Sequence, residues 1–498
     1  MSRLSLDTLS ALPAAVDRPR YDVRSIGVGI VHLGIGAFHR AQTAVYSDDA
    51  LALDRGRWGI CGVSLRAAEV RDKLAPQDGI YTAVEKSPAG IRRRIIGSVR
   101  EVLFLGDQRE KVASRLAASE TRIVSLTITE KGYCHDPATG KLNFHHPDIV
   151  HDLAHPGEPQ SAIGMISAAL DARRASHGAT LTVLCCDNLP HNGALVRALV
   201  LAYAETRDPA LARWIEDNAS FPSTMVDRIV PATTDGDIAD NDAVLGVHDA
   251  APVMHEPFKQ WAIEDNFVAG RPRWEDVGAE LVADVAPFET MKLRLLNGSH
   301  SAFAYLGFLA GHEYIYEVAA QPCFVAFMRQ MMGDEIVPTL RVPAGVDIAA
   351  YQQALLTRFG NPALPHRTQQ IAMDGSQKLP QRLLGTVRDN LNAGRSIELL
   401  ALAVAGWMRY VGGRDEAGRP IKISDPLSET FARIAERSGI HRGGDPAALV
   451  DGLLGIRAIF GDDLPADPRF AGPVSAWLKS LVAAGAARTV ARATPGAA

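Results

Sequence analysis

The 498 residues are too many for a single compact core, so at least two domains are expected. Hydrophobic residues make up 47% and charged residues 22%, which is the composition of an ordinary globular protein. The formal net charge of −5 gives no general attraction to nucleic acid or to anionic membranes. The five cysteines have no CxxC spacing, which argues against a disulfide framework and against a structural zinc site.

The N-terminal segment lacks the continuous apolar core of a signal peptide. The longest uncharged apolar stretch, 399–408, is about ten residues long, well short of the roughly 20 that a membrane span needs. Together with the cysteine pattern, these features lead us to expect a cytoplasmic protein that does not bind membranes.

Short β-branched runs alternate with helical stretches from residue 1 to residue 286, and the runs are apolar almost throughout, as strands covered on both faces are. The candidate strands are 28–33, 60–65, 94–97 with its neighbours, 123–128 and 181–186, and the helical stretches include 162–176 and 193–203. The alternation predicts a doubly wound, mostly parallel sheet, and hence an α/β domain. From 287 to 498 long helical stretches dominate, and we expect a mostly α-helical domain.

The first predicted strand leads directly into a glycine-containing turn, Gly34-Ile-Gly36. Two glycines allow a tight turn and let a pyrophosphate approach the helix N-terminus, where free N–H groups favour negative charge. His39 replaces the third glycine of the usual fingerprint, so the spacing alone fits a structural turn equally well. Its place after a buried strand favours a cofactor loop, with Phe38, His39 and Arg40 as further cofactor contacts.

The end of the second predicted strand bears on the choice of cofactor. An acid there binds the ribose 2′-hydroxyl of NAD, whereas an arginine accommodates the 2′-phosphate of NADP. Glu69 favours NAD and Arg66 favours NADP, but either residue fits equally well as a solvated charge on the following helix. We expect NAD, with NADP as the alternative.

Four polar side chains are grouped in segment 288–303. In an α-helix, Lys292, Glu289, His300 and Asn297 lie at about 0°, 60°, 80° and 140°, on one side of the helix. The same side carries apolar residues: Leu293, Leu296 and Phe303. Because buried polar groups are costly unless they are paired, this face predicts either a functional site or a satisfied polar network between domains.

Chemistry favours the functional interpretation. Alcohol oxidation without a metal needs a base, and a lysine shielded from water has its pKa lowered toward neutrality. Asparagine amides can donate to the developing alkoxide. A second asparagine, Asn188, follows the strand at 181–186, where open α/β sheets bind ligands. Asn188 is equally explained as a turn residue, and His191 is better explained as a loop histidine.

These motifs resemble those of the polyol-specific long-chain dehydrogenase/reductase family, which contains mannitol 2-dehydrogenases, fructuronate reductases (mannonate oxidoreductases) and tagaturonate reductases. The resemblance runs from 30–41 (IVHLGIGAFHRA) to beyond 405–410 (AGWMRY). Segment 221–231 (FPSTMVDRIVP) is similar to the family signature. The spacing of Lys292, Asn297 and His300 matches the family's catalytic motif.

The resemblance implies a Rossmann-type dinucleotide-binding domain at 1–286, a mostly helical substrate and catalytic domain at 287–498, and a cleft between them. It implies Lys292 as the general acid/base, without a metal, and Asn188 and Asn297 as the groups that polarise the reacting oxygen. It also implies that His300 positions the substrate and that Glu289 lies on a proton path to solvent. Many members of the family are monomers, so a monomer is expected and a dimer is the alternative.

Different segments of the chain resemble family members with different substrates. Asp227 and Lys378 match substrate-contacting positions, although Asp227 is equally explained as a structural partner of Arg228. Segment 186–193 is similar to mannitol dehydrogenases, and segment 370–382 is more similar to fructuronate reductases. In the latter segment, Gln370 replaces an arginine of the mannitol enzymes, and Arg382 replaces an aromatic residue.

A cation at Arg382 suits a substrate carboxylate, and a surface arginine on a helix is the equal alternative. We therefore expect reduction of D-fructuronate by NADH to D-mannonate. The alternative within the class is a mannitol 2-dehydrogenase or a broad polyol dehydrogenase acting on D-mannitol, D-arabinitol or D-sorbitol. Another class would be a catalytically inactive, cofactor-binding regulatory protein, which has no need of the lysine motif. A metal-dependent enzyme is disfavoured, because the histidines form no ligand cluster at helical or hairpin spacing.

Overall fold

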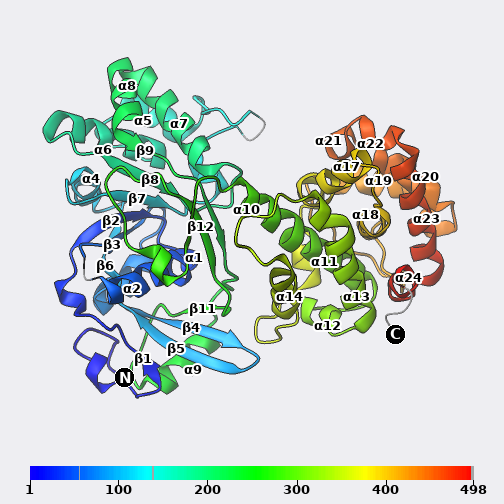
Figure 1. The fold of residues 1–498 in the computed structure, drawn as a ribbon, viewed down its shortest axis with the longest axis horizontal. Helices are drawn as coiled ribbons and strands as arrows, with labels where there is room; N and C mark the ends of the chain where they lie inside the picture. The colour runs from blue at the N-terminus through cyan, green and yellow to red at the C-terminus, as the bar shows by residue number, and fades with distance from the viewer. Residues whose placement is uncertain (55, 137–138, 495–498) are drawn as a thin grey trace. The chain divides into compact units, whose positions relative to one another are not determined.

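The computed structural model describes residues 1–54, 56–136 and 139–494. The chain divides into two compact units, Met1–Ala286 and Pro287–Ala498. Figure 1 draws the first unit in blue to green and the second in green to red. Strands β1 to β13 all belong to the first unit, and the second unit is built from helices.

A six-stranded parallel sheet forms the centre of the first unit, in the order β6-β3-β2-β7-β8-β9. The strands are β2 (Val28–Leu33), β3 (Gly59–Ser64), β6 (Val99–Phe104), β7 (Ile123–Leu126), β8 (Leu181–Cys185) and β9 (Ala219–Ser220). From β2 the chain adds two strands on one side, then returns and adds three on the other, which is the order of a Rossmann-type domain. The prediction of a doubly wound parallel sheet is confirmed.

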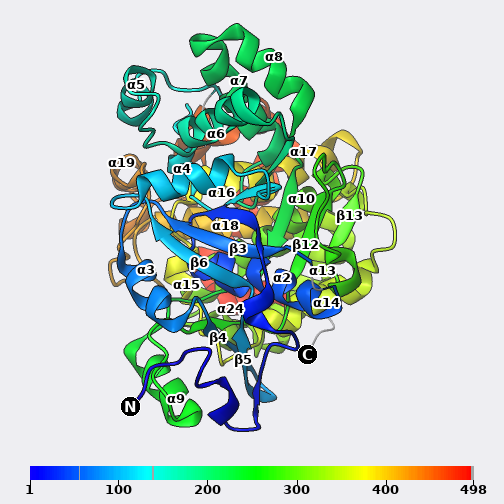
Figure 2. The ribbon, with the colours of Figure 1, turned by 90° about the vertical axis from the view of Figure 1, so that its left-hand side faces the viewer.

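Both faces of this sheet are covered, which explains why its strands are so apolar. Val31, Val63 and Val124 pack on one face with α4 (Arg109–Ala117), α6 (Ala162–Ser176) and α7 (Asn192–Arg207). Ile30, Ile60 and Ile123 pack on the other face with α2 (Thr43–Leu53). Alternate residues of each strand therefore reach opposite cores. In Figures 1 and 2, α4, α6 and α7 lie on the same side of the sheet.

The prediction that residues 94–97 contribute a strand to the parallel sheet is wrong. They overlap β5 (Gly90–Ile96), which pairs antiparallel with β4 (Tyr81–Ser87) in a separate sheet of order β1-β5-β4-β11. The arginines at 92–94 leave this strand exposed or half-exposed over much of its length. A strand covered on both faces does not allow that, whereas an antiparallel hairpin does.

The other elements of the first unit surround these two sheets. A third sheet has the order β10-β12-β13. The remaining strands are β1 (Val16–Asp17), β10 (Thr224–Asp227), β11 (Val253–His255), β12 (Gln260–Glu264) and β13 (Glu280–Val282). The remaining helices are α1 (Ala37–Ala41), α3 (Glu69–Leu74), α5 (Pro147–Ala154), α8 (Pro209–Asn218) and α9 (Asp235–Leu245).

A buried helix, α18 (Glu398–Val411), is central to the second unit. α11 (Ser299–Leu309) and α23 (Pro468–Ala484) pack against it. Its first backbone N–H groups lack intrahelical partners. Glu335 is buried and meets this need, because its carboxylate accepts hydrogen bonds from the N–H groups of Leu399 (3.0 Å) and Leu400 (2.8 Å).

Further helices surround α18, as the sequence predicts for this half of the chain. They are α10 (Ala286–Met291), which begins at the unit boundary, α12 (Ile315–Ala319), α13 (Pro322–Gln330), α14 (Ile348–Phe359), α15 (Thr368–Ile371), α16 (Gly375–Leu379), α17 (Gly385–Asn392), α19 (Ser428–Ser438), α20 (Pro446–Leu454), α21 (Arg457–Phe460), α22 (Asp463–Ala466) and α24 (Ala486–Ala493). Three segments are π-helical: Lys292–Gly298, Met331–Ile336 and Pro380–Leu384.

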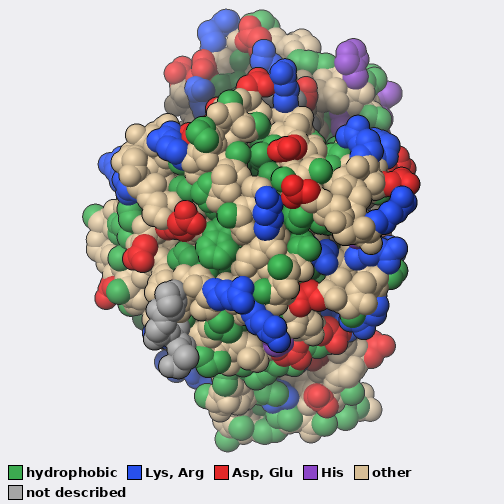
Figure 3. Space-filling model, turned by 90° about the vertical axis from the view of Figure 1, so that its right-hand side faces the viewer, with side chains coloured by type: hydrophobic (Ala, Val, Ile, Leu, Met, Phe, Trp, Pro, Cys, Tyr) green, Lys and Arg blue, Asp and Glu red, His purple; other side chains and the backbone are tan. Residues whose placement is uncertain are grey.

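Charged side chains of both signs are interspersed over the face drawn in Figure 3. This mixture agrees with the near balance of 52 basic and 57 acidic residues. Within the described part of the chain, none of the helices combines the length and the apolar character needed to cross a membrane.

Gly34 directly follows β2 and has a φ of +97°, and a Cβ at this position would lie 2.1 Å from the carbonyl oxygen of Thr127. Gly34→Ala is expected to lower the free energy of unfolding by about 2 kcal/mol or more, because both the backbone conformation and the contact become strained. Urea unfolding followed by tryptophan fluorescence measures the change. Gly157→Ala is the control, since a Cβ there meets nothing within 4 Å. Equal stability of the two variants would contradict the expectation.

Candidate functional site

The strand order reverses between β2 and β7, and open α/β sheets bind ligands beside the carboxyl ends of strands at such a point. The glycine turn that follows β2 is held from both sides. The N–H groups of Gly34 and Ile35 donate to the carbonyl of Val63 at the end of β3 (2.9 and 3.3 Å). On the other side, the hydroxyl of Thr127 donates to the carbonyl of Gly34 (2.8 Å).

The second glycine of the turn leaves room for a ligand. Gly36 is exposed, and the nearest atom to a Cβ placed there is the carbonyl oxygen of Gly34, at 3.8 Å. Helix α1 begins immediately afterwards. An accessible backbone at a helix start, beside the switch point of the sheet, fits a dinucleotide pyrophosphate.

His39, at the position of the usual third glycine, is buried and stacks on His32 of β2, with ring centroids 3.4 Å apart. The Nδ1 atom of His39 lies 2.5 Å from the hydroxyl of Thr43, and His32 hydrogen-bonds to Ser125 and Thr127. Burial lowers the pKa of His32 to about 3 and holds the pKa of His39 well below its usual value. The neutral pair joins α1 to β2 and β7. The Nε2 atom of His39 is buried and has no hydrogen-bond partner among the described residues.

The neighbouring residues of α1 pack into the protein. Arg40 is buried, and its guanidinium donates to the carbonyl of Ala251 and lies 5.3 Å from the ring centroid of Tyr81. The hydroxyl of Tyr81 donates to the carbonyl of Arg40 (2.7 Å). Phe38 is half-buried against the same core. The side chain of Arg40 therefore secures α1.

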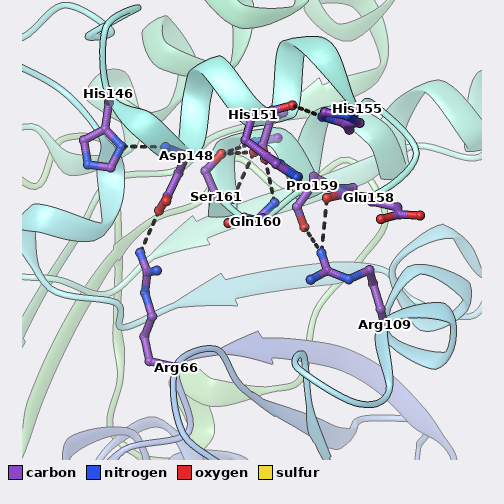
Figure 4. A network of polar contacts seen from close by, with 12 residues as sticks. Arg66, Arg109, His146, Asp148, His151, His155, Glu158, Pro159, Gln160 and Ser161 are labelled. Atoms are coloured by element: carbon purple, nitrogen blue, oxygen red, sulfur yellow. Dashed lines mark hydrogen bonds and ion pairs between the residues drawn. The ribbon is translucent and has the colours of Figure 1, made fainter.

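Both charges considered for the adenosine ribose have protein partners. Glu69 lies in the first turn of α3, where its 71% exposed side chain pairs with Lys73 (2.6 Å). Glu69 is therefore a solvated charge on the helix that follows β3, which is the alternative that the sequence left open. Arg66 pairs with Asp148 of α5 at 2.7 Å (Figure 4).

Asn188 follows β8, and its neighbour Asp187 ties this strand end to that of β7. The Asp187 carboxylate accepts hydrogen bonds from the N–H groups of Ile128 (2.8 Å) and Thr129 (3.1 Å) and from the hydroxyl of Tyr133 (2.6 Å). Thr129 has a φ of +65°, a strained conformation for a β-branched residue. Burial raises the pKa of Asp187 above its usual value. The sequence analysis did not single out Asp187, although an acid directly after a buried strand could have indicated it.

The start of α7 is tied to the same strand ends. The side-chain amide of Asn192 donates to the carbonyls of Asp187 (3.0 Å) and Thr224 (2.8 Å), and its oxygen accepts from the N–H of Thr224 (2.9 Å). His191 occupies a left-handed turn (φ +48°) that precedes α7. These bonds fix the backbone on both sides of Asn188.

Asp227 ends β10 and is buried, as is its neighbour Arg228. Arg228 donates hydrogen bonds to the carbonyls of Ala41 (2.6 Å) and Glu256 (3.1 Å). Burial lowers the pKa of Arg228 to about 10. The segment 221–231 thus contributes both a carboxylate and a structural cation to the first unit.

In the second unit, segment 288–303 is not the continuous α-helix that the sequence predicts. The angles derived from 100° per residue for its polar side chains are therefore wrong. Lys292–Gly298 is π-helical and lies between α10 and α11. A π-helix bonds residue i to residue i+5, so a residue five positions further on returns toward the same side. Lys292 and Asn297 have this separation. Such π segments are rare and frequently mark functional sites.

The π segment packs closely on the π segment Pro380–Leu384. A Cβ on Gly298 would lie 2.7 Å from the carbonyl oxygen of Arg382, so only glycine permits this approach. Arg382 donates to the hydroxyl of Ser301 (3.1 Å) and is half-buried. Arg382 is therefore not a fully exposed surface arginine.

His300 begins the next helical turn in cationic surroundings. Its ring centroid lies 5.6 Å from that of His366, and its Nε2 atom is buried without a hydrogen-bond partner among the described residues. Burial, followed by the charges of His366, Arg382, Arg358 and Lys378, holds the pKa of His300 well below its usual value. Burial and the Arg382 charge lower the pKa of Lys378. Lys292, Asn297 and Glu289 are half-buried, whereas Gln370 is exposed on α15.

One group of potential metal ligands was not foreseen, because its members come from different turns. Ligand atoms of Cys134, His146 and Asp148 lie within 4.8 Å of one another. The donor set does not fit a metal ion well. Burial and the Asp148 charge raise the pKa of Cys134 to about 11, and the Asp148 carboxylate is paired with Arg66. His146 Nδ1 accepts a hydrogen bond from the N–H of Asp148 (3.2 Å).

A Rossmann-type sheet with a glycine turn at its switch point is typical of dinucleotide-binding domains. Residues 28–276 match the model of the mannitol dehydrogenase Rossmann domain, and residues 284–482 match that of the mannitol dehydrogenase C-terminal domain. The chain belongs to the mannitol dehydrogenase family and is an oxidoreductase that acts on CH–OH groups.

Relatives with different named substrates align over nearly the whole chain. The D-mannonate oxidoreductase of Escherichia coli (strain K12) is 48% identical over 97% of this chain and 98% of that relative. The mannitol 2-dehydrogenase of Pyricularia oryzae is 39% identical over 98% of both. The structure of Pseudomonas fluorescens mannitol 2-dehydrogenase with NAD and D-mannitol has a TM-score of 0.82 and 40% identity, covering 98% of this chain and 99% of that one.

The buried His32 makes stability depend on pH. Its pKa is about 3 in the folded chain and about 6.5 when solvated, so the unfolded state binds the proton more tightly between these values. This contribution to stability is present above pH 6.5 and is lost as the pH falls toward 3. The free energy of unfolding falls as the pH is lowered from 7 to 5. In His32→Gln this fall is expected to be about 2 kcal/mol smaller than in the wild type.

Urea unfolding at the two pH values measures this difference. His155→Gln, at an exposed position, is the control. An unchanged pH dependence in the His32 variant would show that this residue is not held neutral by the fold.

Proposed function

We propose that this chain is an NAD-dependent oxidoreductase that interconverts D-fructuronate and D-mannonate, with Lys292 as a metal-free general acid/base. The observation that carries the proposal is the π segment, which returns Lys292 and Asn297 toward the same side of one helix, followed by His300. In this proposal the unit Met1–Ala286 binds the dinucleotide, and the unit Pro287–Ala498 supplies the acid/base and most substrate contacts.

The nicotinamide cofactor, when bound, would supply the hydride to the carbonyl carbon in its reduced form, NADH, and would accept a hydride from the alcohol carbon in its oxidised form, NAD, in the reverse direction. During reduction, the protonated ammonium of Lys292 delivers a proton to the substrate oxygen, and in oxidation the neutral amine takes that proton. The amides of Asn188 and Asn297 donate to the oxygen as its negative charge develops. His300 positions the substrate, and Glu289 lies on the path by which the proton reaches solvent.

The glycine turn is the proposed pyrophosphate site. In this proposal the backbone at Gly34 and Gly36 approaches the phosphates and Phe38 borders the site. The buried ring of His39 supports the turn by stacking on His32. Arg40 contributes by holding α1 in place through the carbonyl of Ala251.

A substrate carboxylate suits the cationic surroundings of His300. Lys378 and Arg382 are both half-buried, and burial lowers the pKa of each, so an anionic ligand would gain by neutralising them. We propose that Arg382 binds the acid group of the sugar in a bidentate fork and that Lys378 and Asp227 contact its hydroxyls. The 48% identity with a D-mannonate oxidoreductase supports this choice.

The second candidate is a mannitol 2-dehydrogenase or a broader polyol dehydrogenase. It is favoured by the 40% identity with an enzyme whose structure holds NAD and D-mannitol. An inactive regulatory protein is disfavoured, because binding alone does not require the lysine, asparagine and histidine of the π segment.

Initial rates with NADH and NADPH separate these candidates. The expected order of kcat/KM is fructuronate above tagaturonate and fructose in reduction, and mannonate above mannitol and arabinitol in oxidation. A preference for mannitol over mannonate would contradict the sugar acid assignment.

Lys292→Ala is expected to lower kcat by about 10²–10⁴-fold, because positioned proton transfer contributes that much. The dissociation constant for NADH, measured by fluorescence, should stay within about threefold of wild type. Lys479→Ala, at a side chain that is 53% exposed in the same unit, is the control and should retain full activity. A fully active Lys292 variant would overturn the proposed role.

Arg382→Ala is expected to lower kcat/KM for mannonate by about 10–10²-fold more than for mannitol, since only the acid loses a charged hydrogen bond. Arg457→Ala, at an 82% exposed position, should affect both substrates equally. Equal losses on mannonate and mannitol in the Arg382 variant would remove the carboxylate argument.

A further inference from the structure

The end of β3 lies directly against the glycine turn, through the hydrogen bonds that Gly34 and Ile35 donate to Val63. The chain then turns tightly, and the hydroxyl of Ser64 donates to the carbonyl of Ala67. Arg66 lies within this turn. In a Rossmann-type domain, a dinucleotide on the glycine turn directs its adenosine ribose toward this strand end.

The carboxylate that meets Arg66 comes from a distant part of the sequence. Asp148 lies 82 residues further along the chain, in the first turn of α5, and its Oδ2 atom is 2.7 Å from an Nη atom of Arg66 (Figure 4). The Asp148 side chain is only 15% exposed, whereas that of Arg66 is 71% exposed. The aspartate is therefore the fixed member of the pair, and the arginine is the one that extends toward it.

Two local features hold Asp148 in place. His146 caps α5, since its Nδ1 atom accepts a hydrogen bond from the backbone N–H of Asp148 (3.2 Å). A carboxylate in the first turn of a helix is also favoured by the partial positive charge of the helix N-terminus. The acid expected from the sequence, Glu69, is instead engaged with Lys73 on the surface of α3.

An arginine alone at this strand end favours NADP, because its fork matches the 2′-phosphate of the adenosine ribose. The ion pair with Asp148 makes Arg66 less favourable for NADP. A 2′-phosphate has a charge of about −1.5 to −2, so it would have to displace the carboxylate from Arg66 and would be repelled by it. A 2′-hydroxyl is neutral and meets no such repulsion.

We propose that Asp148 determines the cofactor preference of this chain, by keeping the Arg66 guanidinium from the 2′-phosphate and so selecting NADH over NADPH. The proposal rests on the proposed function, because it concerns the dinucleotide of that same reaction. It assigns the discriminating acid to α5 instead of to the end of β3.

The test compares binding as well as turnover for Asp148→Ala. The dissociation constants of NADH and NADPH, measured by fluorescence, report the preference without catalysis, and calorimetry with 2′-phospho-ADP-ribose isolates the phosphate contact. The variant is expected to bind NADPH at least about tenfold more tightly than wild type, since an uncompensated arginine gains a charged hydrogen bond. Its affinity for NADH should change by less than about threefold. The gain should shrink as salt is raised.

The double variant Arg66→Ala/Asp148→Ala tests whether the gain passes through the arginine, and it should return NADPH affinity to near the wild-type value. Asp148→Asn keeps the shape of the side chain in case removal of the carboxylate disturbs α5, and it should show the same direction of change. Glu69→Gln is the matched control at the other acid and should leave the ratio of affinities unchanged.

The proposal is overturned if both Asp148 variants bind NADPH no more tightly than wild type, if the gain persists without Arg66, or if the wild-type chain already prefers NADPH. A failure of the proposed function is recognised by the substrate instead: the wild-type chain would prefer mannitol to mannonate or would oxidise neither. The effect of the Asp148 variants on the ratio of NADPH to NADH affinity is measured without substrate and is therefore separate from that outcome.

Discussion

The approach of Gly34 to the carbonyl of Thr127 is the contact on which the proposed cofactor site depends. It occurs where the strand order of the parallel sheet reverses, and only a residue without a Cβ tolerates it. The hydroxyl of Thr127 in turn binds the carbonyl of Gly34. With the glycine turn fixed in this way, the ends of β2, β3, β7 and β8 lie in register, and the residues that follow them share one edge of the sheet.

Along that edge the polar groups are mostly satisfied within the protein. Asp187 accepts three hydrogen bonds and keeps the strained Thr129 in place, while Asn192 holds the start of α7. An exception close to this edge is the Nε2 atom of His39, which is buried without a partner among the described residues. Within the second unit, considered by itself, the Nε2 atom of His300 is buried in the same way, and buried polar atoms without partners are unfavourable.

The relatives explain why substrate assignment depends on so few residues. A mannonate oxidoreductase and a mannitol 2-dehydrogenase align with this chain over almost its full length, so relatives of this length and similarity differ in the substrates for which they are named. A sugar acid differs from a polyol by one carboxylate, and a carboxylate is discriminated by the local excess of positive charge. In the proposed function, Arg382 and Lys378 would provide that excess through their position near His300, whereas the net charge of the chain is negative.

The order of the amino acids predicts the features that depend on neighbouring residues: the apolar strands, the glycine turn after β2, the helical character of the second half and the spacing of Lys292, Asn297 and His300. Packing in three dimensions places 94–97 in a separate antiparallel sheet and widens the helix at Lys292 into a π turn against Arg382. Packing also brings Arg66 to Asp148 and not to an acid nearby in the sequence. Strand and helix patterns follow from local periodicity, whereas pairing between segments 82 residues apart depends on packing that periodicity does not encode.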